Sequence, residues 1–178
     1  MVINAFVDLF KKIHTSQKNF IPTDWKTLHD DFAVLTSYTF VKIPENLLQK
    51  ALQISDQLLA SDGPQHLLHC DLHCRNILQF QDSFIAIDPW PSVGPLEYEA
   101  ASFLTSPTDL LLLRDDIKEI LQNRLNKLSH LLNLNKQQLK DCSLMRVMLL
   151  ACLCESRNKN DDWIEQFIQI AEIIDKLN

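Results

Sequence analysis

Three polar residues in one short stretch of this chain are of the types that phosphoryl transfer requires. Asp71 is followed by Asn76, and an apolar run that begins at Ile85 ends at Asp88. A hydroxyl that attacks a phosphoryl group needs a carboxylate to accept its proton, and Mg²⁺ needs amide and carboxylate oxygens nearby. The order of the three residues therefore predicts a base followed by two metal ligands.

The same segment permits three other interpretations. Asp71 and Asn76 could cap a turn beside a structural histidine. Zinc could be bound by histidine and cysteine, although structural zinc usually takes two ligand pairs separated by a loop. A cysteine nucleophile could act beside a histidine, although nothing in the sequence indicates a lowered thiol pKa. The residues concerned are His69, Cys70, His73, Cys74, Cys152 and Cys154.

Composition limits the classes of function. A length of 178 residues suits one domain, and a net charge of −6 argues against a nucleic-acid partner, which would need a basic face. The two glycines cannot form a dinucleotide-binding or P-loop motif. The five cysteines are an odd number with no secretory signal before them, which predicts free thiols in the cytoplasm. The longest apolar run, Val147–Cys154, is far below the ~18 residues of a membrane span.

Hydrophobic periodicity predicts a mainly α chain with a small β-hairpin unit. It forms one domain with helices in 1–62, the polar segment and a hairpin in 66–95, and helices again in 96–178. Asp24 is expected to cap a helix that carries Leu28 and Phe32, and Asn135 with Gln138 to cap a buried helix. The remaining expectations are a strand at 66–68, hairpin strands at 77–80 and 84–87, a loop at 89–95, and helices at 2–14, 45–59, 96–104, 117–132, 139–154 and 161–177.

Several short segments of the chain resemble motifs of a known enzyme family. Leu67–Leu78 is similar to the catalytic loop of the aminoglycoside phosphotransferases, which share the protein-kinase-like fold. Ile85–Pro89, Gly94 and Glu97–Ala101 resemble the branch that includes streptomycin 6-phosphotransferases and hydroxyurea kinases. The resemblance covers 45–178 well and the first 40 residues loosely. It implies ATP and Mg²⁺ as cofactors and a small hydroxylated, aminoglycoside-like molecule as the acceptor, with no nucleic acid and no membrane.

The resemblance also assigns roles to individual residues. Asp71 would be the catalytic base, His69 would brace the loop, and Asn76 and Asp88 would bind Mg²⁺. Substrate-binding roles fall to His73, Arg75, Trp90, Glu97 and Glu99. The two glutamates would face a cationic or polyhydroxylated acceptor, or else form a solvated helix face.

The chain departs from the family pattern at several positions. Cys70 stands where glycine is usual, so it would be strained if that position requires a positive φ. Arg75 either crowds the phosphate or neutralises it. Trp90 either stacks on a substrate ring or packs on a neighbouring residue.

The largest departure concerns the ATP-binding half of the site. The resemblance begins where the C-terminal lobe of a kinase begins, so we expect the C-terminal lobe of the protein-kinase-like (α+β) fold with its N-lobe absent. The expected function is that of an ATP-dependent kinase for a streptomycin-like antibiotic, truncated relative to its family. The alternatives are an inactive remnant or binding module that keeps the fold, or one half of a split kinase whose N-lobe is a separate chain.

Overall fold

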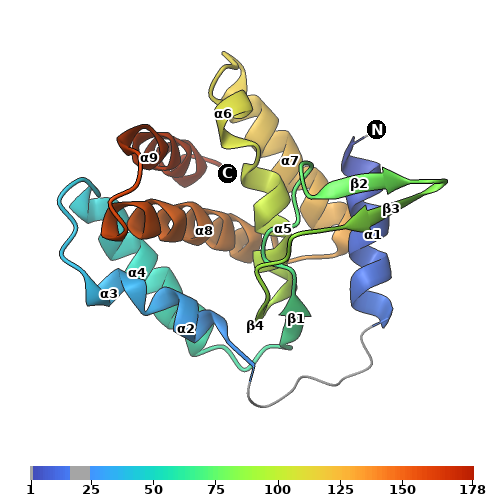
Figure 1. Cartoon of the computed structure of the whole chain (residues 1–178), viewed down its shortest axis with the longest axis horizontal. Coiled ribbons are helices and arrows are strands. Elements are labelled where there is room, and N and C mark those ends of the chain that lie inside the picture. Colours follow the sequence, from blue (N-terminus) through green and yellow to red (C-terminus); the bar gives the residue numbers. More distant parts are fainter. Residues whose placement is uncertain (1, 17–24) are drawn as a thin grey trace.

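The computed structural model describes residues 2–16 and 25–178, and most of these residues are helical (Figure 1). This confirms the prediction of a mainly α chain with a small β unit. The helices are α1 Val2–Ser16, α2 Leu28–Phe32, α3 Val34–Ser37, α4 Glu45–Leu59, α5 Leu96–Thr105, α6 Thr108–Leu111, α7 Ile117–Leu132, α8 Lys136–Ser156 and α9 Asp161–Asp175. The strands are β1 His66–Leu68, β2 Ile77–Phe80, β3 Ser83–Ala86 and β4 Ser92–Gly94.

Helix α8 forms the centre of the helical body and packs against α9, α5 and α4 (Figure 1). Most of its apolar side chains are buried, and Met145 and Met148 have no exposed surface. The helix begins as predicted, since Asn135 Oδ1 accepts a hydrogen bond from the backbone N–H of Gln138 at 3.0 Å. From this central position the side chain of Arg146 on α8 reaches the polar segment that follows β1.

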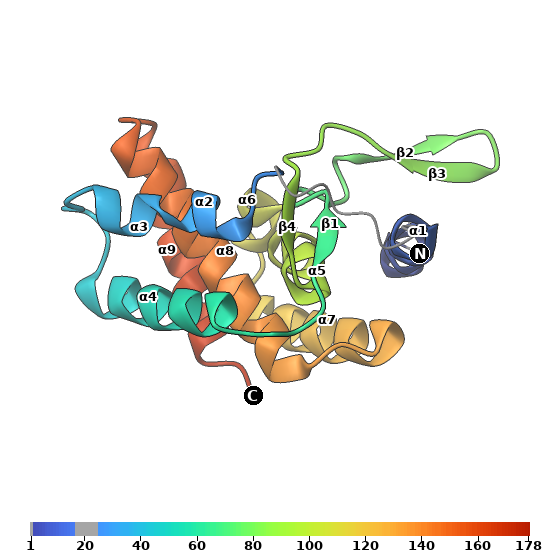
Figure 2. The ribbon, with the colours of Figure 1, turned by 90° about the horizontal axis from the view of Figure 1, so that it is seen from below.

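The predicted hairpin is confirmed, because β2 and β3 pair antiparallel from Ile77–Ala86 to Phe80–Ser83. The hairpin projects from the body beside α1 (Figure 2). Several of its apolar side chains are exposed, Phe80 to 57%. The segment that carries the polar residues therefore runs from the helical body into a protruding two-stranded ribbon.

The predicted loop at 89–95 is wrong in part, because residues 92–94 form β4, which pairs antiparallel with β1. The pairing depends on a close approach at Gly94. A Cβ there would lie 2.9 Å from Cγ of Leu28 and 3.2 Å from Cδ1 of Leu68, so no larger residue fits without movement of the packed leucines. Strand pairing over such a short span depends on contacts far away in the sequence, which periodicity does not register.

The predicted cap Asp24 lies outside the described residues, and α2 begins after Thr27. The backbone N–H and the hydroxyl of Thr27 donate to the Asp30 carboxylate at 2.8 and 3.0 Å. The hydrogen bond from the Thr27 backbone is the main reason why the pKa of Asp30 is lowered. Helix α1 packs through Phe6, whose ring stacks on Phe103 of α5 with centroids 4.2 Å apart. None of the helices in the described ranges is long and apolar enough to cross a bilayer.

Candidate active site

The segment from His69 to Asn76 connects β1 to β2 and is held by a buried carboxylate. Glu99 of α5 has no exposed surface, and its two oxygens accept hydrogen bonds from the backbone N–H groups of His69 at 3.0 Å and Cys70 at 2.7 Å. Cys70 has a φ of 59°, which confirms that this position requires the left-handed region. His14 of α1 places its Nε2 3.4 Å from the same carboxylate. The Glu99 carboxylate of α5 therefore fixes the start of the segment, and His14 of α1 lies against that carboxylate.

The carboxylate of Asp71 is oriented by two side chains. Arg146 of α8, only 4% exposed, donates to Asp71 Oδ1 at 2.6 Å and to the carbonyl oxygen of Cys70 at 2.6 Å. The amide nitrogen of Asn76 donates to Asp71 Oδ2 and to the Asp71 carbonyl, both at 2.9 Å. Charge-assisted bonds of this kind hold a carboxylate in one rotamer. The Asp71 side chain remains 28% exposed, so it is still accessible to a bound molecule.

The imidazole of His69 ties this segment to the end of the hairpin. Its Nε2 lies 2.9 Å from the carbonyl oxygen of Ile87, and its Nδ1 accepts from the backbone N–H of Asp71 at 3.3 Å. A neutral ring protonated on Nε2 satisfies both contacts. The backbone N–H of Ile87 also donates to the carbonyl of Asn76 at 3.0 Å. Asp88 is the next residue, is exposed and has a φ of 57°, so it is anchored beside the Asp71 segment.

The expected Mg²⁺ ligands fit a hard cation in their chemistry. The amide nitrogen of Asn76 is engaged by Asp71, which leaves its amide oxygen as the group to offer a metal ion. Asp88 supplies an exposed carboxylate on the adjoining strand end. Mg²⁺ takes oxygen ligands and usually completes its coordination with water and nucleotide phosphates, so one amide and one carboxylate are a sufficient contribution from protein.

A cavity of about 540 Å³ opens in front of Asp71. Three of the predicted substrate-binding residues, His73, Arg75 and Trp90, line it. Arg75 donates to the Asp109 carboxylate of α6 at 2.8 Å, and its effect on a phosphate stays a prediction. Trp90 has Lys26 Nζ 5.4 Å from its ring centroid. The other lining residues are Ser106, Pro107, Thr108, Arg146, Leu150, Trp163, Gln166 and Phe167.

His73 lies beside the base and favours its neutral form. Burial lowers the pKa of His73, and the neighbouring Asp71 carboxylate, 3.5 Å away, only partly opposes that effect. Arg146 and Arg75 lower the pKa further through their positive charges. At neutral pH this ring can therefore serve as a hydrogen-bonding group without adding positive charge to the cavity.

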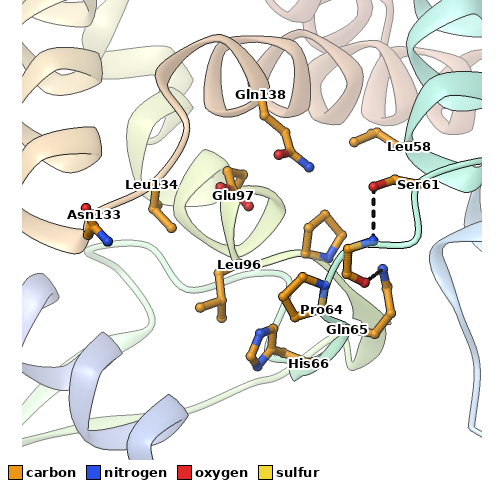
Figure 3. Close-up of a pocket in the computed structure, with 12 residues that line it drawn as sticks. Leu58, Ser61, Pro64, Gln65, His66, Leu96, Glu97, Asn133, Leu134 and Gln138 are labelled. Carbon is orange, nitrogen blue, oxygen red and sulfur yellow. Dashed lines mark hydrogen bonds between the residues drawn. The ribbon is translucent and has the colours of Figure 1, made fainter.

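The two glutamates predicted to face a substrate do not lie in this cavity. Glu99 is wholly buried and accepts from loop N–H groups, so it positions the segment instead. Glu97 accepts from the backbone N–H of Asn135 at 3.1 Å. It lines a second cavity of about 230 Å³, near Leu134 and Gln138 (Figure 3). The burial of Glu99 therefore argues against its assignment to an acceptor site, whereas the substrate-binding role of Glu97 stays a prediction.

The zinc and cysteine-nucleophile interpretations find little support. Across residues 2–16 and 25–178, no group of three or more histidine, cysteine, aspartate or glutamate side chains could hold a metal ion. Burial is the main cause that raises the pKa of the Cys70 thiol, and the Glu99 carboxylate adds to it. Burial likewise raises the pKa of Cys152, to about 12. A thiol that is protonated at neutral pH is a poor nucleophile and a poor metal ligand.

Two residues of the site were not predicted from the sequence. Arg146 orients Asp71 and is an arginine within a helix that is otherwise apolar around its middle, which is a signal for a buried ion pair. Trp163 of α9 lines the cavity and is 53% exposed. Its sequence neighbourhood indicates only an amphipathic helix, so no local signal could identify its place in the cavity.

Two solved kinases share this fold. The amicoumacin kinase hAmiN, in complex with AMP-PNP, Ca²⁺ and Ami, aligns with a TM-score of 0.61 and 20% identity, over 97% of this chain and 58% of that one. A choline/ethanolamine kinase family protein from Mesorhizobium loti aligns with a TM-score of 0.65 and 12% identity, over 97% of this chain and 61% of that one. The chain thus spans about three fifths of the length of these two kinases.

Among curated proteins the chain has no significant match. A family model does match, and it covers residues 3–161. The match includes the whole stretch from His69 to Asp88, where the oriented carboxylate, the amide and the second carboxylate lie. By that match, this chain belongs to the aminoglycoside/hydroxyurea antibiotic resistance kinase family.

Proposed function

We propose that this chain carries the acceptor-binding and catalytic half of an ATP-dependent kinase for a hydroxyl group of a small molecule. The observation that carries the proposal is the Asp71 carboxylate, held by Arg146 and Asn76 and still exposed to a cavity. Family membership supports a phosphotransferase. A streptomycin-like acceptor and a cytoplasmic location remain parts of the proposal, drawn from the sequence.

In this proposal Asp71 accepts the proton of the attacking hydroxyl. Arg146 and Asn76 keep the carboxylate in one orientation, which matters because phosphoryl transfer depends mainly on positioning and on charge neutralisation. Asn76 and Asp88 would hold Mg²⁺, which supplies positive charge next to the phosphates when it is bound. His69 keeps the Asp88 strand end in register with the Asp71 segment through the Ile87 carbonyl.

The remaining part of the nucleotide site is proposed to come from an N-lobe, either encoded with this sequence or supplied by a separate chain. The aligned kinases are longer than the matched region, which supports this part of the proposal. The same observation favours the second candidate, a non-catalytic module that keeps the fold. In that case the Asp71 segment would be retained for structural reasons alone.

Calorimetry of Mg²⁺-ATP binding to the 178-residue chain tests the metal assignment without any acceptor. We expect Asp88→Ala to abolish detectable binding, whereas the matched control Asp82→Ala, an exposed aspartate at the hairpin turn, should leave it unchanged. Equal binding by wild type and Asp88→Ala would remove the assignment. ATP-dependent phosphorylation of streptomycin that is lost in Asp71→Asn would exclude the non-catalytic module.

A further inference from the structure

Arg124 of α7 is a partly buried guanidinium that has no carboxylate beside it. Its Nη1 donates to three backbone carbonyls at the end of α5, those of Phe103 at 3.2 Å, Leu104 at 3.1 Å and Ser106 at 2.8 Å. Within the described parts of the chain, no aspartate or glutamate pairs with Arg124, and burial lowers its pKa. The carbonyls engage one nitrogen, which leaves Nε and Nη2 on the opposite edge free to donate. A partly buried cation without an anion is costly, so this edge favours a bound carboxylate.

The other arginines of the described ranges have either a carboxylate partner or full exposure to water. Arg146 is buried but holds the Asp71 carboxylate, whereas Arg157 is exposed. The remaining two arginines form the surface pairs Arg75–Asp109 and Arg114–Asp116. In the second pair the carboxylate takes the Nε and Nη2 edge of the guanidinium, which is the edge that stays free in Arg124.

Arg124 lines a cavity of about 430 Å³ whose walls are otherwise mostly apolar. Leu110 and Leu111 of α6, Ile120 of α7 and Ile3 of α1 supply most of that surface. Leu110 is 53% exposed, so it lies at the open side of the cavity. The volume falls within the range of ~300–1,000 Å³ that is usual for small-molecule sites. An apolar cavity with one unneutralised cation in its wall is complementary to an anion that carries an apolar chain.

The other charged groups near this cavity leave Arg124 as the charge that a ligand would meet. Among the described residues that line it there is no carboxylate, lysine or histidine. Arg114 also lines it, but Asp116 accepts from Nε and Nη2 of Arg114 at 2.9 and 3.1 Å, and Asp115 adds negative charge beside it. Both aspartates, and Glu119 in the first turn of α7, are exposed and lie outside the lining. Salt and water therefore screen their repulsion of an incoming anion.

The cavity adjoins the candidate active site without containing it. Cys74, which belongs to the segment that carries Asp71, lines this cavity, and Pro107 lines both cavities. Asp71 and the two predicted metal ligands, Asn76 and Asp88, are not in its lining. A ligand in this cavity would therefore occupy a second site that shares one wall residue with the first.

We propose that this second cavity binds a free carboxylic acid with an apolar chain. The Nε and Nη2 groups of Arg124 donate to the two oxygens of its carboxylate, and the chain lies against the leucines of α6. The inference goes beyond the proposed function, since it concerns a separate site and holds whether or not Asp71 is a catalytic base.

The test compares three probes that share an octyl chain and differ in the head group: octanoate, 1-octanol and octylamine. Calorimetry on the wild-type chain should show octanoate binding about tenfold more tightly than 1-octanol, because two charge-assisted hydrogen bonds are added to the same apolar contact. Octylamine, which is a cation at neutral pH, should show no detectable binding. This comparison needs no variant, so it remains decisive even where a substitution disturbs folding.

Two substitutions separate the charge from the apolar wall. Arg124→Gln should lower the affinity for octanoate to that for 1-octanol, because the amide can still donate to the α5 carbonyls but carries no charge. Leu110→Ser should weaken the binding of octanoate and 1-octanol alike, by about fivefold, since it removes apolar surface from an exposed position. Leu113→Ser is the matched control, because Leu113 is 79% exposed and does not line the cavity. It should leave both affinities unchanged.

Several outcomes would overturn the inference. Equal affinity for octanoate and 1-octanol would mean apolar adsorption only, and no binding of octanoate would remove the site. The same holds if Arg124→Gln leaves octanoate binding intact, or if Leu110→Ser behaves like Leu113→Ser. A wild-type dimer in sedimentation that Leu110→Ser converts to a monomer, without octanoate binding, would assign the cavity to a contact between two copies. None of these measurements uses ATP or an acceptor, so their failure is distinct from a failure of the proposed function.

Discussion

Replacing Arg146 by methionine tests whether the ion pair with Asp71 holds the site together. Arg146 is buried, and its guanidinium contacts both the Asp71 carboxylate and the Cys70 carbonyl. Removing one partner of a fully buried pair costs about 3–5 kcal/mol. Here Asp71 keeps its bond from Asn76 and is 28% exposed, so water takes over part of the lost interaction.

We therefore expect a loss in the free energy of unfolding near the low end of that range, about 3 kcal/mol, offset by less than about 1 kcal/mol from the buried methionine. The net loss is about 2 kcal/mol, which corresponds to a fall in Tm of about 4–8 °C for a chain of this size. The similar volume of methionine keeps a cavity from contributing to the result.

The assay is urea denaturation of the wild type, Arg146→Met, Asp71→Asn and the double variant. Asp71→Asn leaves the guanidinium buried without its anionic partner, so both single variants should be destabilised. The double variant should lose less than the sum of the two losses, with a coupling energy above about 1 kcal/mol. Arg75→Met, which breaks an exposed pair with Asp109, is the control and should cost less than about 1 kcal/mol.

Two results would refute this reasoning. The first is a loss for Arg146→Met that is no larger than the loss for Arg75→Met. The second is strict additivity in the double variant. Either would mean that the two side chains lie close together without depending on one another, and that Asn76 alone positions the carboxylate.

Three further predictions concern the same region. Cys70→Val should destabilise the chain about 2 kcal/mol more than Cys70→Gly in urea denaturation, because a β-branched residue is poorly tolerated at a φ of 59°; equal losses would argue against strain at this position. Gly94→Ala should cost about 1–3 kcal/mol, and Leu28→Ala should be less harmful in that background than in the wild type, since it makes room for the new methyl group; no coupling would contradict the steric argument. Because burial lowers the folded-state pKa of His73, the unfolded chain binds the extra proton, so stability should fall as the pH drops below about 6.5. Unfolding free energies measured from pH 7.5 to 5 should decline less steeply for His73→Gln, and an unchanged slope would count against this assignment.

The polar segment and most helices could be predicted because their signals are local. The periodicity of apolar residues located the helix 117–132 and the two hairpin strands, and the side chain of Asn135 identified the start of α8. The roles of Asp71 and Asn76 could be predicted from their spacing because the two residues also lie close together in the sequence. An amide five residues after the base returns to it through one turn and donates to both its backbone and its side chain.

The errors arose where the direction of a side chain depends on distant packing. Glu97 and Glu99 lie two positions apart on α5, so their side chains point about 200° apart around the helix axis. They cannot both face one cavity, and helix geometry alone could have excluded that assignment. Which of the two turns inward was not readable, because it depends on how β1 and α8 lie against α5. The pairing of β4 with β1 and the contact of Arg146 with Asp71 also join residues far apart in the sequence, so they could not be predicted from local patterns.

The scarcity of glycine has its clearest consequence in the Asp71 segment. The chain has two glycines, and both have ordinary backbone angles, while Cys70 and Asp88 adopt positive φ. A non-glycine residue in this region is strained by about 1–2 kcal/mol, and such strain persists only where surrounding contacts over-determine the conformation. The contacts are visible on both sides of Cys70, since Glu99 accepts its N–H and Arg146 donates to its carbonyl. Buried groups on α5 and α8 therefore impose a backbone geometry that the local sequence disfavours, and the same geometry sets the direction of the Asp71 carboxylate.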